Sequence, residues 1–442
     1  MMLSASSPVR PLKVTPLSPH SGCFSPAGRD PTSRDSAGGE SILRVSHTFE
    51  RYTMTTFRSG IALTAALMLA ALTGCGASNT VSSSPSASAS SSVSAASSSV
   101  ASSQAWKDLV SATGVEITYN ADGSRVLTDN SGQKVELPAT VERIANLWDA
   151  NNQVMLLLGS SDHIVATTQQ ISKMPWYKKV QPKIAQASTP VSGTDLNIEE
   201  LLKAKPDVVV SIDKAQVEKA RTAGLTTVQL GFQDFAGLKK NVVMTAEVLG
   251  TDQARSQAIK YLAYLEKNLK FVSERTASLS DDQRPKVLHI AGGSDVTKVD
   301  GSDSIIGEWM KAAGAKNSID GVANYKNISL EQIIASAPDA IIVGNSDAQQ
   351  GIDAIKADAA WKDVPAVKND KLYRNPVGTF KWDRYSTEEA LQLLWAGKTL
   401  HPELFTDVDL VKETREFYST FYGYQLTEDD AQRILAGQNP AS

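Results

Sequence analysis

Cysteine is scarce in this sequence of 442 residues, since Cys23 and Cys75 are its only two. The chain after Cys75 therefore cannot be held by disulfides and must rely on a hydrophobic core. A strong charge excess is also lacking, because the formal net charge is −4. This value argues against nucleic acid as a partner. The five histidines are scattered singly, which argues against a site that holds a bare metal ion through imidazoles.

Catalytic signatures are missing as well. The sequence has no Gly-x-Ser-x-Gly elbow, no phosphate-binding loop, no His-Glu-x-x-His pair and no cysteine nucleophile after residue 75. We therefore expect a protein that is not an enzyme, that has no cofactor and that contains no resident metal site.

Long apolar runs are limited to Ile61–Leu72. This run is shorter than the ~20 residues of a membrane-spanning helix and has the length of the apolar part of a signal peptide. It follows a mildly positive start at Met54 and ends in Leu-Thr-Gly-Cys75, which resembles the bacterial lipobox. We predict a lipoprotein signal peptide over 54–75, lipidation of Cys75 and an extracytoplasmic protein whose contact with the cell membrane is the lipid anchor. The alternative is an ordinary secretory signal in which the cysteine is accidental.

The segments on either side of this signal have biased compositions. Residues 1–53 are rich in Pro, Ser, Gly and Arg without periodicity, and we expect a non-native or disordered extension, with Met54 as the true start. Fourteen of the 23 residues from Val81 to Ser103 are serine. Such a segment buries too little apolar surface to offset its ordering entropy. We therefore predict a flexible tether over 76–105.

From Val115 onward, short apolar runs alternate with amphipathic segments, which is typical of α/β proteins. Between two such halves, Ala258, Leu262, Leu265 and Leu269 form one apolar stripe of a long helix, predicted over about 252–279. A helix of that length is more easily explained as a brace between two lobes than as a core helix of one large domain. We predict an N-terminal α/β lobe over 113–250, a connecting helix over 251–280, a C-terminal α/β lobe over 285–404 and further helices over 405–442. The expected strands are 144–147, 164–167, 208–212, 227–230, 287–290, 340–343 and 371–374.

An internal repeat supports two lobes. The segment from Ile198 to Ser211 aligns without gaps with the segment from Leu330 to Val343. Each has a glutamate near its start and a Pro-Asp pair before an apolar run, which predicts a helix, a stop and a buried strand. Use of one such unit in each half is what two similar lobes require, although helix–Pro-Asp–strand units are common in α/β proteins.

Several segments, in order and at matching spacing, resemble the iron-siderophore/cobalamin periplasmic-binding proteins, the solute-binding components of ABC importers for metal chelates. The resemblance runs from about Val126 to Phe405. It is carried by Val126–Pro138, Arg143-Ile144, Asn197-Ile-Glu, Lys205-Pro-Asp-Val-Val-Val210, Arg284–Ile290, Ala312–Asn317, Ile328-Ser-Leu-Glu331, Pro338-Asp339, Pro365–Asn369 and Leu372-Tyr373.

The resemblance implies two α/β lobes joined by one rigid helix, with the ligand in the cleft between the lobes and only a small hinge motion. It implies a monomer that captures a metal chelate, a ferric siderophore first of all, and delivers it to an ABC permease with its ATPase. Haem, cobalamin, a nickel or cobalt complex and molybdate are alternative cargoes. A chelate sensor or adhesin that is not coupled to transport is the alternative of another class.

In this family one glutamate of each lobe docks into arginine pockets of the permease, and the matching positions are Glu199 and Glu331. Two distant carboxylates can give an oriented, bivalent contact through bidentate arginine pairs. The alternative is that both are solvated acids favoured by a helix N-terminus.

The cleft should be lined by loops that follow the carboxyl ends of the strands. Lysine and arginine would pair with an anionic chelate, and aromatic rings would stack on its flat faces. Tyr325 and Tyr385 are also the phenols that could reach a metal, because His289 is expected inside a strand. The candidates are Trp148, Asp149, Asn151, Trp176, Tyr177 and Lys214 in the first lobe, and Ser294, Lys298, Tyr325, Lys326, Arg374, Lys381, Trp382, Arg384 and Tyr385 in the second.

Overall fold

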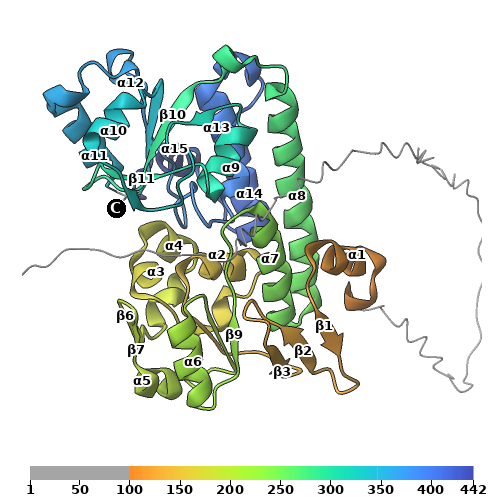
Figure 1. Ribbon diagram of the computed structural model, residues 1–442. Coiled ribbons are helices and arrows are strands. Elements are labelled where there is room, and N and C mark those ends of the chain that lie inside the picture. The colour runs from red at the N-terminus through yellow and green to blue at the C-terminus, as the bar shows by residue number, and fades with distance from the viewer. Residues whose placement is uncertain (1–99, 346, 442) are drawn as a thin grey trace, which may run out of the picture. The chain divides into compact units, whose positions relative to one another are not determined.

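The computed structural model describes residues 100–345 and 347–441, and within them two α/β lobes are joined by one long helix (Figure 1). The two-lobed fold expected from the sequence is therefore confirmed. The predicted extension, signal peptide and Cys75 lie outside the described residues, as does most of the predicted tether.

The described chain begins with a helix and a small sheet that lie against the N-terminal lobe. Helix α1 starts at Gln104 because the Ser103 hydroxyl accepts the Trp106 backbone N–H at 3.3 Å. The Trp106 indole is fully buried and donates to Glu247 at 2.7 Å. Helix α1 thus lies upstream of residue 113, where the first lobe was expected to begin. The elements are α1 (Gln104–Thr113) and the antiparallel strands β1 (Ile117–Tyr119), β2 (Arg125–Thr128) and β3 (Lys134–Leu137).

The N-terminal lobe is built on a parallel sheet with strand order β5-β4-β8-β9. All four residues of β8 are buried, as expected for a short apolar strand with both faces covered. The chain moves from β4 to β5 on one side and then to β8 on the other, so the strand order reverses at β4. The strands are β4 (Ile144–Asn146), β5 (Ile164–Ala166), β8 (Val208–Ser211) and β9 (Thr227–Gln229), with a hairpin of β6 (Val191–Ser192) and β7 (Asp195–Leu196); the helices are α2 (Asp149–Leu157), α3 (Gln169–Lys173), α4 (Pro175–Val180), α5 (Ile198–Ala204), α6 (Lys214–Thr222) and α7 (Phe235–Leu249).

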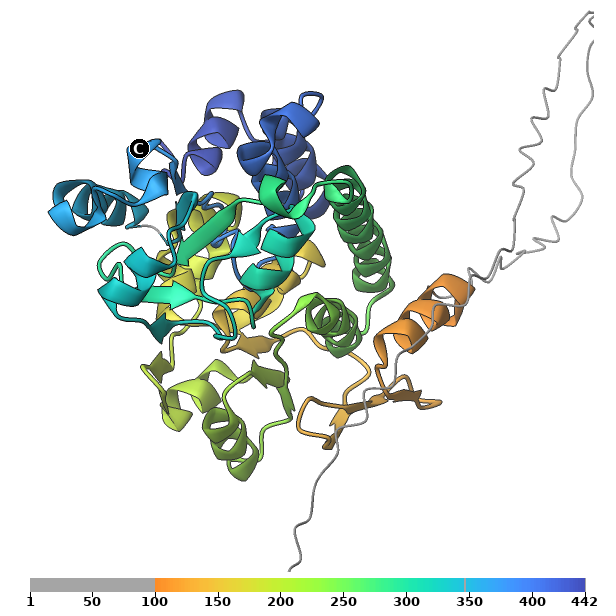
Figure 2. The same ribbon diagram turned by 45° about the horizontal axis from the view of Figure 1, so that its top comes forward.

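Helix α8 (Asp252–Thr276) connects the lobes and is about 38 Å long at 1.5 Å per residue. Its predicted apolar stripe is buried at Ala258, Leu262 and Leu265. Near its start, Arg255 forms an ion pair at 2.9 Å with Glu247 of α7, and both side chains are almost fully buried. Figures 1 and 2 show α8 running along one side of both lobes.

The C-terminal lobe contains a mixed sheet with strand order β13-β11-β10-β14-β15, in which β10, β14 and β15 are parallel. Strand β12 also pairs with β10 in parallel, whereas β11 pairs with β10 in the antiparallel sense. The strands are β10 (Lys286–Ile290), β11 (Lys298–Asp300), β12 (Lys316–Asn317), β13 (Lys326–Asn327), β14 (Ala340–Val343) and β15 (Leu372–Arg374); the helices are α9 (Ile305–Ala312), α10 (Leu330–Ala335), α11 (Ala348–Ala357), α12 (Pro365–Lys368) and α13 (Glu389–Leu400).

The internal repeat is visible in the backbone. Lys205 and Ala337, which occupy equivalent positions, both adopt a left-handed conformation, with φ of 48° and 46°. After each residue comes a Pro-Asp pair whose aspartate reaches its own lobe's first parallel strand. Asp207 accepts the Arg143 N–H at 2.9 Å, and Asp339 accepts the Lys286 N–H at 2.9 Å. The same helix stop and the same strand cap are therefore used once in each lobe.

The C-terminal segment packs back onto both lobes. Its rings form a buried aromatic cluster in which Phe417 and Phe421 lie 5.0 Å apart and Tyr261 of α8 meets Phe421 at 5.8 Å. The elements are α14 (Leu410–Phe417), a π-helical turn (Tyr418–Tyr422) and α15 (Glu428–Leu435).

Candidate solute-binding site

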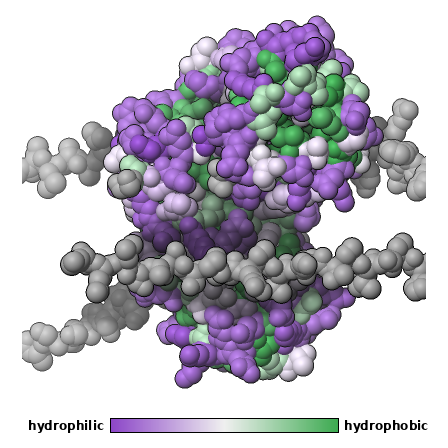
Figure 3. Space-filling model, turned by 90° about the vertical axis from the view of Figure 1, so that its left-hand side faces the viewer, coloured by the Kyte–Doolittle hydropathy of each residue, from purple (hydrophilic) through white to green (hydrophobic). Residues whose placement is uncertain are grey.

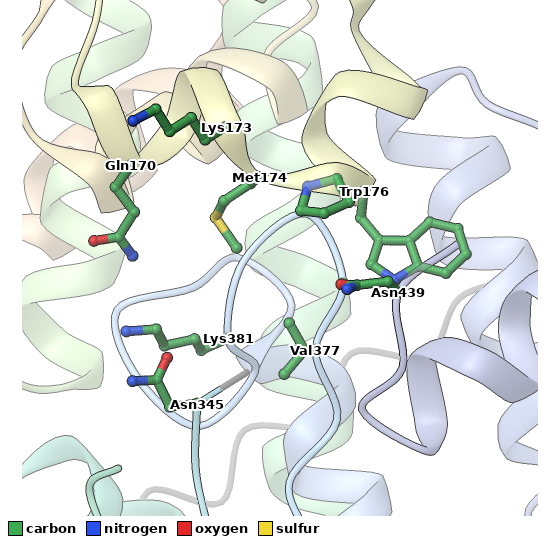
Figure 4. Close-up of a pocket in the computed structure, with 10 residues that line it drawn as sticks. Gln170, Lys173, Met174, Trp176, Asn345, Val377, Lys381 and Asn439 are labelled. Carbon is green, nitrogen blue, oxygen red and sulfur yellow. The ribbon is translucent and has the colours of Figure 1, made fainter. Parts of the chain in front are cut away.

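A cavity of about 350 Å³ opens between the lobes. Asn345 follows β14, and Lys381 lies in the loop after β15. Their side chains lie side by side, across the cavity from Met174 (Figure 4). On this side of the molecule the surface is hollowed between the lobes and is mostly hydrophilic (Figure 3). The cavity is lined by Gln170, Lys173, Met174, Pro175, Trp176, Asn345, Val377, Gly378, Lys381 and Asn439.

The wall from the N-terminal lobe consists of two short helices fixed by local chemistry. The Thr168 hydroxyl accepts the Ile171 N–H at 3.2 Å and starts α3. Pro175 occupies the first position of α4, where a missing N–H costs nothing. Trp176 and Tyr177 then anchor α4, because both side chains are buried. This wall is held by packing beneath it.

The C-terminal segment also forms part of the cavity wall, and it touches both lobes. The Trp176 indole donates to the Gln438 carbonyl at 2.8 Å. From the other lobe, the Arg374 guanidinium donates to the Gly437 carbonyl at 2.6 Å. Asn439, two residues on, lines the cavity. Trp176 and Arg374 therefore position the segment that carries Asn439.

A second cavity, of about 330 Å³, lies in the N-terminal lobe where the strand order reverses. This switch point, at the carboxyl ends of parallel strands, is where open α/β sheets bind ligands. The cavity is lined by Trp148 and Asp149 after β4 and by Asp213 after β8. Gln170 lines both cavities, so the two hollows adjoin.

Two charged groups dominate the electrostatics of this region. Burial lowers the pKa of Lys381, and the nearby Arg384 acts in the same direction. Burial raises the pKa of Asp149, against the opposing effects of the Thr168 hydroxyl, which donates to it, and of Lys381. No ion pair of Lys381 or Lys173 occurs within residues 100–345 and 347–441. An anion in the cavity would therefore stabilise the charged form of Lys381.

The raised pKa of Asp149 predicts that anion binding depends on pH. Above this pKa the carboxylate repels an anion, and below it the neutral acid does not, so affinity should rise as the pH falls through it. Two unit charges roughly 10 Å apart at an effective dielectric of about 20 interact by about 1.7 kcal/mol, which is somewhat more than tenfold. Asp149→Asn should show the low-pH affinity at neutral pH. Calorimetric titrations at several pH values, with an anion of constant charge, check this; an unchanged slope in the variant would contradict it.

An aromatic cluster joins the lobes beside the cavities. Tyr385 of the C-terminal lobe packs against Trp148 and Phe232, with ring centroids 6.3 and 5.7 Å away. Its hydroxyl donates to Gln233 at 2.8 Å and accepts from Asn324. Burial raises the pKa of Tyr385 to about 12.

Arg384 lies in a buried charge cluster of the C-terminal lobe. Its guanidinium is 2.8 Å from Asp300 and 2.9 Å from Asp383, and each carboxylate also contacts His289. Burial alone would raise the pKa of Asp300, but Arg384 and His289 bring it below its usual value. The ring of Tyr325, an exposed residue, lies 4.7 Å from the Arg384 guanidinium. Arg384 is therefore occupied by partners of its own lobe.

The remaining candidates are distributed between the interior and the surface. Asn151 accepts from Asn241 of α7 at 2.8 Å, Tyr177 donates to the Asn152 carbonyl at 2.8 Å, and the Trp382 indole donates to Glu388 at 3.0 Å. These three side chains are buried and line neither cavity. The side chains of Lys214, Ser294 and Lys326 are exposed, and the Lys298 ammonium lies 5.2 Å from the Tyr325 ring. The structure thus brings Trp148, Asp149, Trp176 and Lys381 together at the two cavities.

Several lining residues were not among the sequence candidates. Gln170 and Lys173 lie just after β5, and Asn345 lies just after β14. The carboxyl-end rule, applied to every strand, would have found them. Asn439 lies far outside any strand–loop unit, and no local pattern indicates its position.

Glu199 and Glu331 are exposed in the first turns of α5 and α10, one in each lobe. The backbone N–H of Glu331 and the Ser329 hydroxyl lower the pKa of Glu331. Figure 1 shows both helices on the side of the molecule away from α8.

Two α/β lobes are joined by one bracing helix, and a lined cavity lies between them. The sequence profile of the periplasmic binding protein family matches residues 144–377, which is more than half of the chain. The chain therefore belongs to the periplasmic binding protein family.

Curated relatives are similar in sequence to this chain over three quarters or more of their own length. The molybdate-binding protein MolA of Haemophilus influenzae is 27% identical over 353 residues, which cover 74% of this chain and 98% of that protein. The uncharacterised ABC transporter substrate-binding lipoprotein YvrC of Bacillus subtilis is 24% identical and covers 56% of this chain and 76% of its own. The iron(3+)-hydroxamate-binding protein FhuD of Bacillus subtilis is 23% identical, and the match covers 77% of this chain and 97% of that protein.

Solved structures agree on the fold. A periplasmic solute-binding protein from Veillonella parvula superposes with a TM-score of 0.61 at 23% identity, covering 73% of this chain and 97% of that one. Molybdate-bound MolA of Haemophilus influenzae gives a TM-score of 0.60 at 22% identity, and the superposition covers 69% of this chain and 99% of that one.

Across the described residues, no group of three or more His, Cys, Asp or Glu side chains is arranged to hold a metal ion. Within the same part of the chain, no helix has the length and apolar character needed to cross a bilayer.

Proposed function

We propose that this protein captures an anionic, metal-containing solute in the cavity between its lobes and delivers it to an ABC permease. The observation that carries the proposal is the half-buried Lys381, which faces a cavity also lined by Lys173 and by the amides of Gln170, Asn345 and Asn439. Lysines attract an anion, and amide N–H groups donate hydrogen bonds to its oxygens.

The size of the cavity favours a compact anion. Its volume of about 350 Å³ lies at the small end of the range of ~300–1,000 Å³ for small-molecule sites. A metal oxyanion fits such a space and such a lining. The resemblance to MolA, a molybdate-binding protein, over 98% of its length supports the same class of cargo. We therefore place an oxyanion such as molybdate ahead of the ferric siderophore expected from the sequence.

A ferric chelate is the second candidate, and the adjoining cavity favours it. Gln170 lines both hollows, and Trp148 in the second offers a ring on which a flat ligand can stack. A ligand that spans both hollows would be larger than an oxyanion. The relative named for iron(3+)-hydroxamate supports this reading.

Delivery would use Glu199 and Glu331 as the two contacts with the permease, with the ATPase on the far side of the membrane. The lipid on Cys75 would keep the protein, as a monomer, at the extracytoplasmic face. The exposed positions of both glutamates on separate lobes support this arrangement. A sensor or adhesin of the same fold would bind the solute without needing these acids.

The test is a titration of the purified protein with molybdate, a ferric hydroxamate, haem, cobalamin and nickel, followed by tryptophan fluorescence and calorimetry. We expect submicromolar binding of one anion, with an emission change because Trp176 lines the cavity. Binding of cobalamin or nickel, with no response to either anion, would contradict the proposal.

A further inference from the structure

Glu388 is fully buried at the start of α13 and is surrounded by hydrogen-bond donors. One oxygen accepts from the Thr379 hydroxyl at 2.9 Å and from the Phe380 N–H at 3.1 Å. The other accepts from the Trp382 indole at 3.0 Å and from the Tyr418 hydroxyl. A buried carboxylate requires such compensation. No ion pair to Glu388 occurs in the described part of the chain, so these neutral donors solvate it.

Of the donors just named, three (Thr379, Phe380 and Trp382) belong to the loop 376–382, which also carries the cavity-lining residues Val377, Gly378 and Lys381. The loop is closed by a β-bridge between Val377 and Lys381 and by a hydrogen bond from the Gly378 N–H to the Phe380 carbonyl at 2.8 Å. A Cβ at Gly378 would collide with Glu388 Oε1. One face of the loop therefore rests on the Glu388 carboxylate, and residues on the other face line the cavity.

The same carboxylate is connected to the other lobe through Gln153 of α2. The Gln153 amide donates to Glu388 at 3.4 Å and to Thr379 at 3.2 Å. Its carbonyl oxygen accepts from the Ser386 hydroxyl at 2.8 Å and from the Thr387 N–H at 3.1 Å. Gln153 thus spans the two lobes beneath the cavity.

Helix α8 also reaches this point. The Tyr261 hydroxyl donates to the Thr387 carbonyl at 3.0 Å, and Asn268 donates to the Ala390 carbonyl at 2.8 Å. The connecting helix, the N-terminal lobe and the cavity loop are therefore all joined to residues 386–390.

We propose that Glu388 is a positioning residue for solute binding: its carboxylate holds the loop 376–382, and with it Lys381, in the shape that the solute requires, and Gln153 ties that shape to the opposite lobe. The inference rests on the proposed function for its effect on affinity. The geometry of the loop can be tested without any solute.

The test compares Glu388→Gln with Glu389→Gln. Glu389 is the next residue of the same helix, is equally buried, and neither of its carboxylate oxygens has a hydrogen-bond partner among the described residues. In Glu388→Gln, amide hydrogen exchange in 376–382 should increase and the indole N–H resonance of Trp382 should shift. Affinity for molybdate or ferric hydroxamate, whichever the wild type binds, should fall about tenfold, because the glutamine amide nitrogen cannot accept the hydrogen bonds that one of the two oxygens accepts from the loop, which leaves buried donors unpaired. Glu389→Gln should change none of these.

Thr379→Val, which removes one donor and keeps the carboxylate, provides a second variant if Glu388→Gln fails to fold. It should change the amide exchange of 376–382, the Trp382 indole resonance and the affinity in the same direction, each by a smaller amount. A folded Glu388→Gln protein with wild-type exchange in the loop would overturn the positioning role, as would an equal loss in Glu389→Gln. If the wild type binds neither probe, the proposed cargo fails, while the exchange and indole measurements still decide the role of Glu388.

Discussion

Lys381→Met should lower the affinity for the anionic solute at least 30-fold while the protein remains folded. Methionine preserves much of the length and apolar contact of the side chain and removes the charge. Lys381 is half-buried at the cavity wall, and burial lowers its pKa, so its charge is poorly solvated without a partner. Truncating one member of a buried, hydrogen-bonded charge pair costs about 2–5 kcal/mol. Calorimetric titration of the variant with the solute that the wild type binds measures the loss.

Lys371→Met is the matched control, because Lys371 is exposed and lies just before β15, outside both cavities. It should bind as the wild type does. Undiminished binding in Lys381→Met would remove Lys381 from the site and would place the solute elsewhere.

Charge reversal of both Glu199 and Glu331 to arginine should abolish solute uptake and leave solute affinity unchanged. The two carboxylates are exposed, lie in separate lobes and line neither cavity. Replacing an attractive contact with a like-charge one at both ends of a bivalent interface removes affinity and orientation together. Uptake of labelled solute by cells that express the variant, combined with calorimetry on the purified protein, separates the two effects.

The control is Glu116→Arg with Glu136→Arg, which makes the same change in net charge at two exposed residues, one directly before β1 and one in β3. Uptake should be normal in this control. Normal uptake in the Glu199 and Glu331 variant would rule out docking through these acids and would favour a sensor or adhesin.

The fold was predictable because burial imposes periodic patterns on the sequence. Strand β14 (Ala340–Val343) has the bounds expected from its apolar run, and α8 begins at Asp252 as expected and ends at Thr276 instead of about 279. The repeat unit was recognisable because a helix stop and a buried strand each restrict residue type. Helix α1 was missed because it directly follows the serine-rich segment, and the burial of Trp106, whose indole donates to Glu247, holds it against α7.

The site was predictable only in part, because contacts in loops follow no period. Trp148, Asp149, Trp176 and Lys381, which line the two cavities, were predicted from their position after strands or from the clustering of rings and charges. Trp382 and Arg384 lie close to Lys381 in the sequence but are buried, because Trp382 donates to Glu388 and Arg384 pairs with Asp300, which lies 84 residues away. Asn439 depends on the contact of the C-terminal segment with Trp176, which joins residues 262 positions apart.

The bracing helix bears on how the lobes can move. Arg255 joins α8 to Glu247 of the N-terminal lobe, and Tyr261 and Asn268 join it to the start of α13. If the lobes were joined by a flexible extended segment, they could rotate without disturbing such hydrogen bonds. Because α8 is bonded to both lobes, a rotation of one lobe against the other must strain these bonds. We therefore expect closure of only a few degrees when solute binds.

The central claim is that an anionic metal species binds between the lobes, and anomalous diffraction tests it most directly. Crystals grown with molybdate or with a ferric chelate, measured at the absorption edge of that metal, locate the metal atom without reference to a ligand model. We expect one strong anomalous peak in the cavity bounded by Lys381, Asn345 and Trp176. A strong peak elsewhere on the protein, or none despite tight binding in solution, would contradict it.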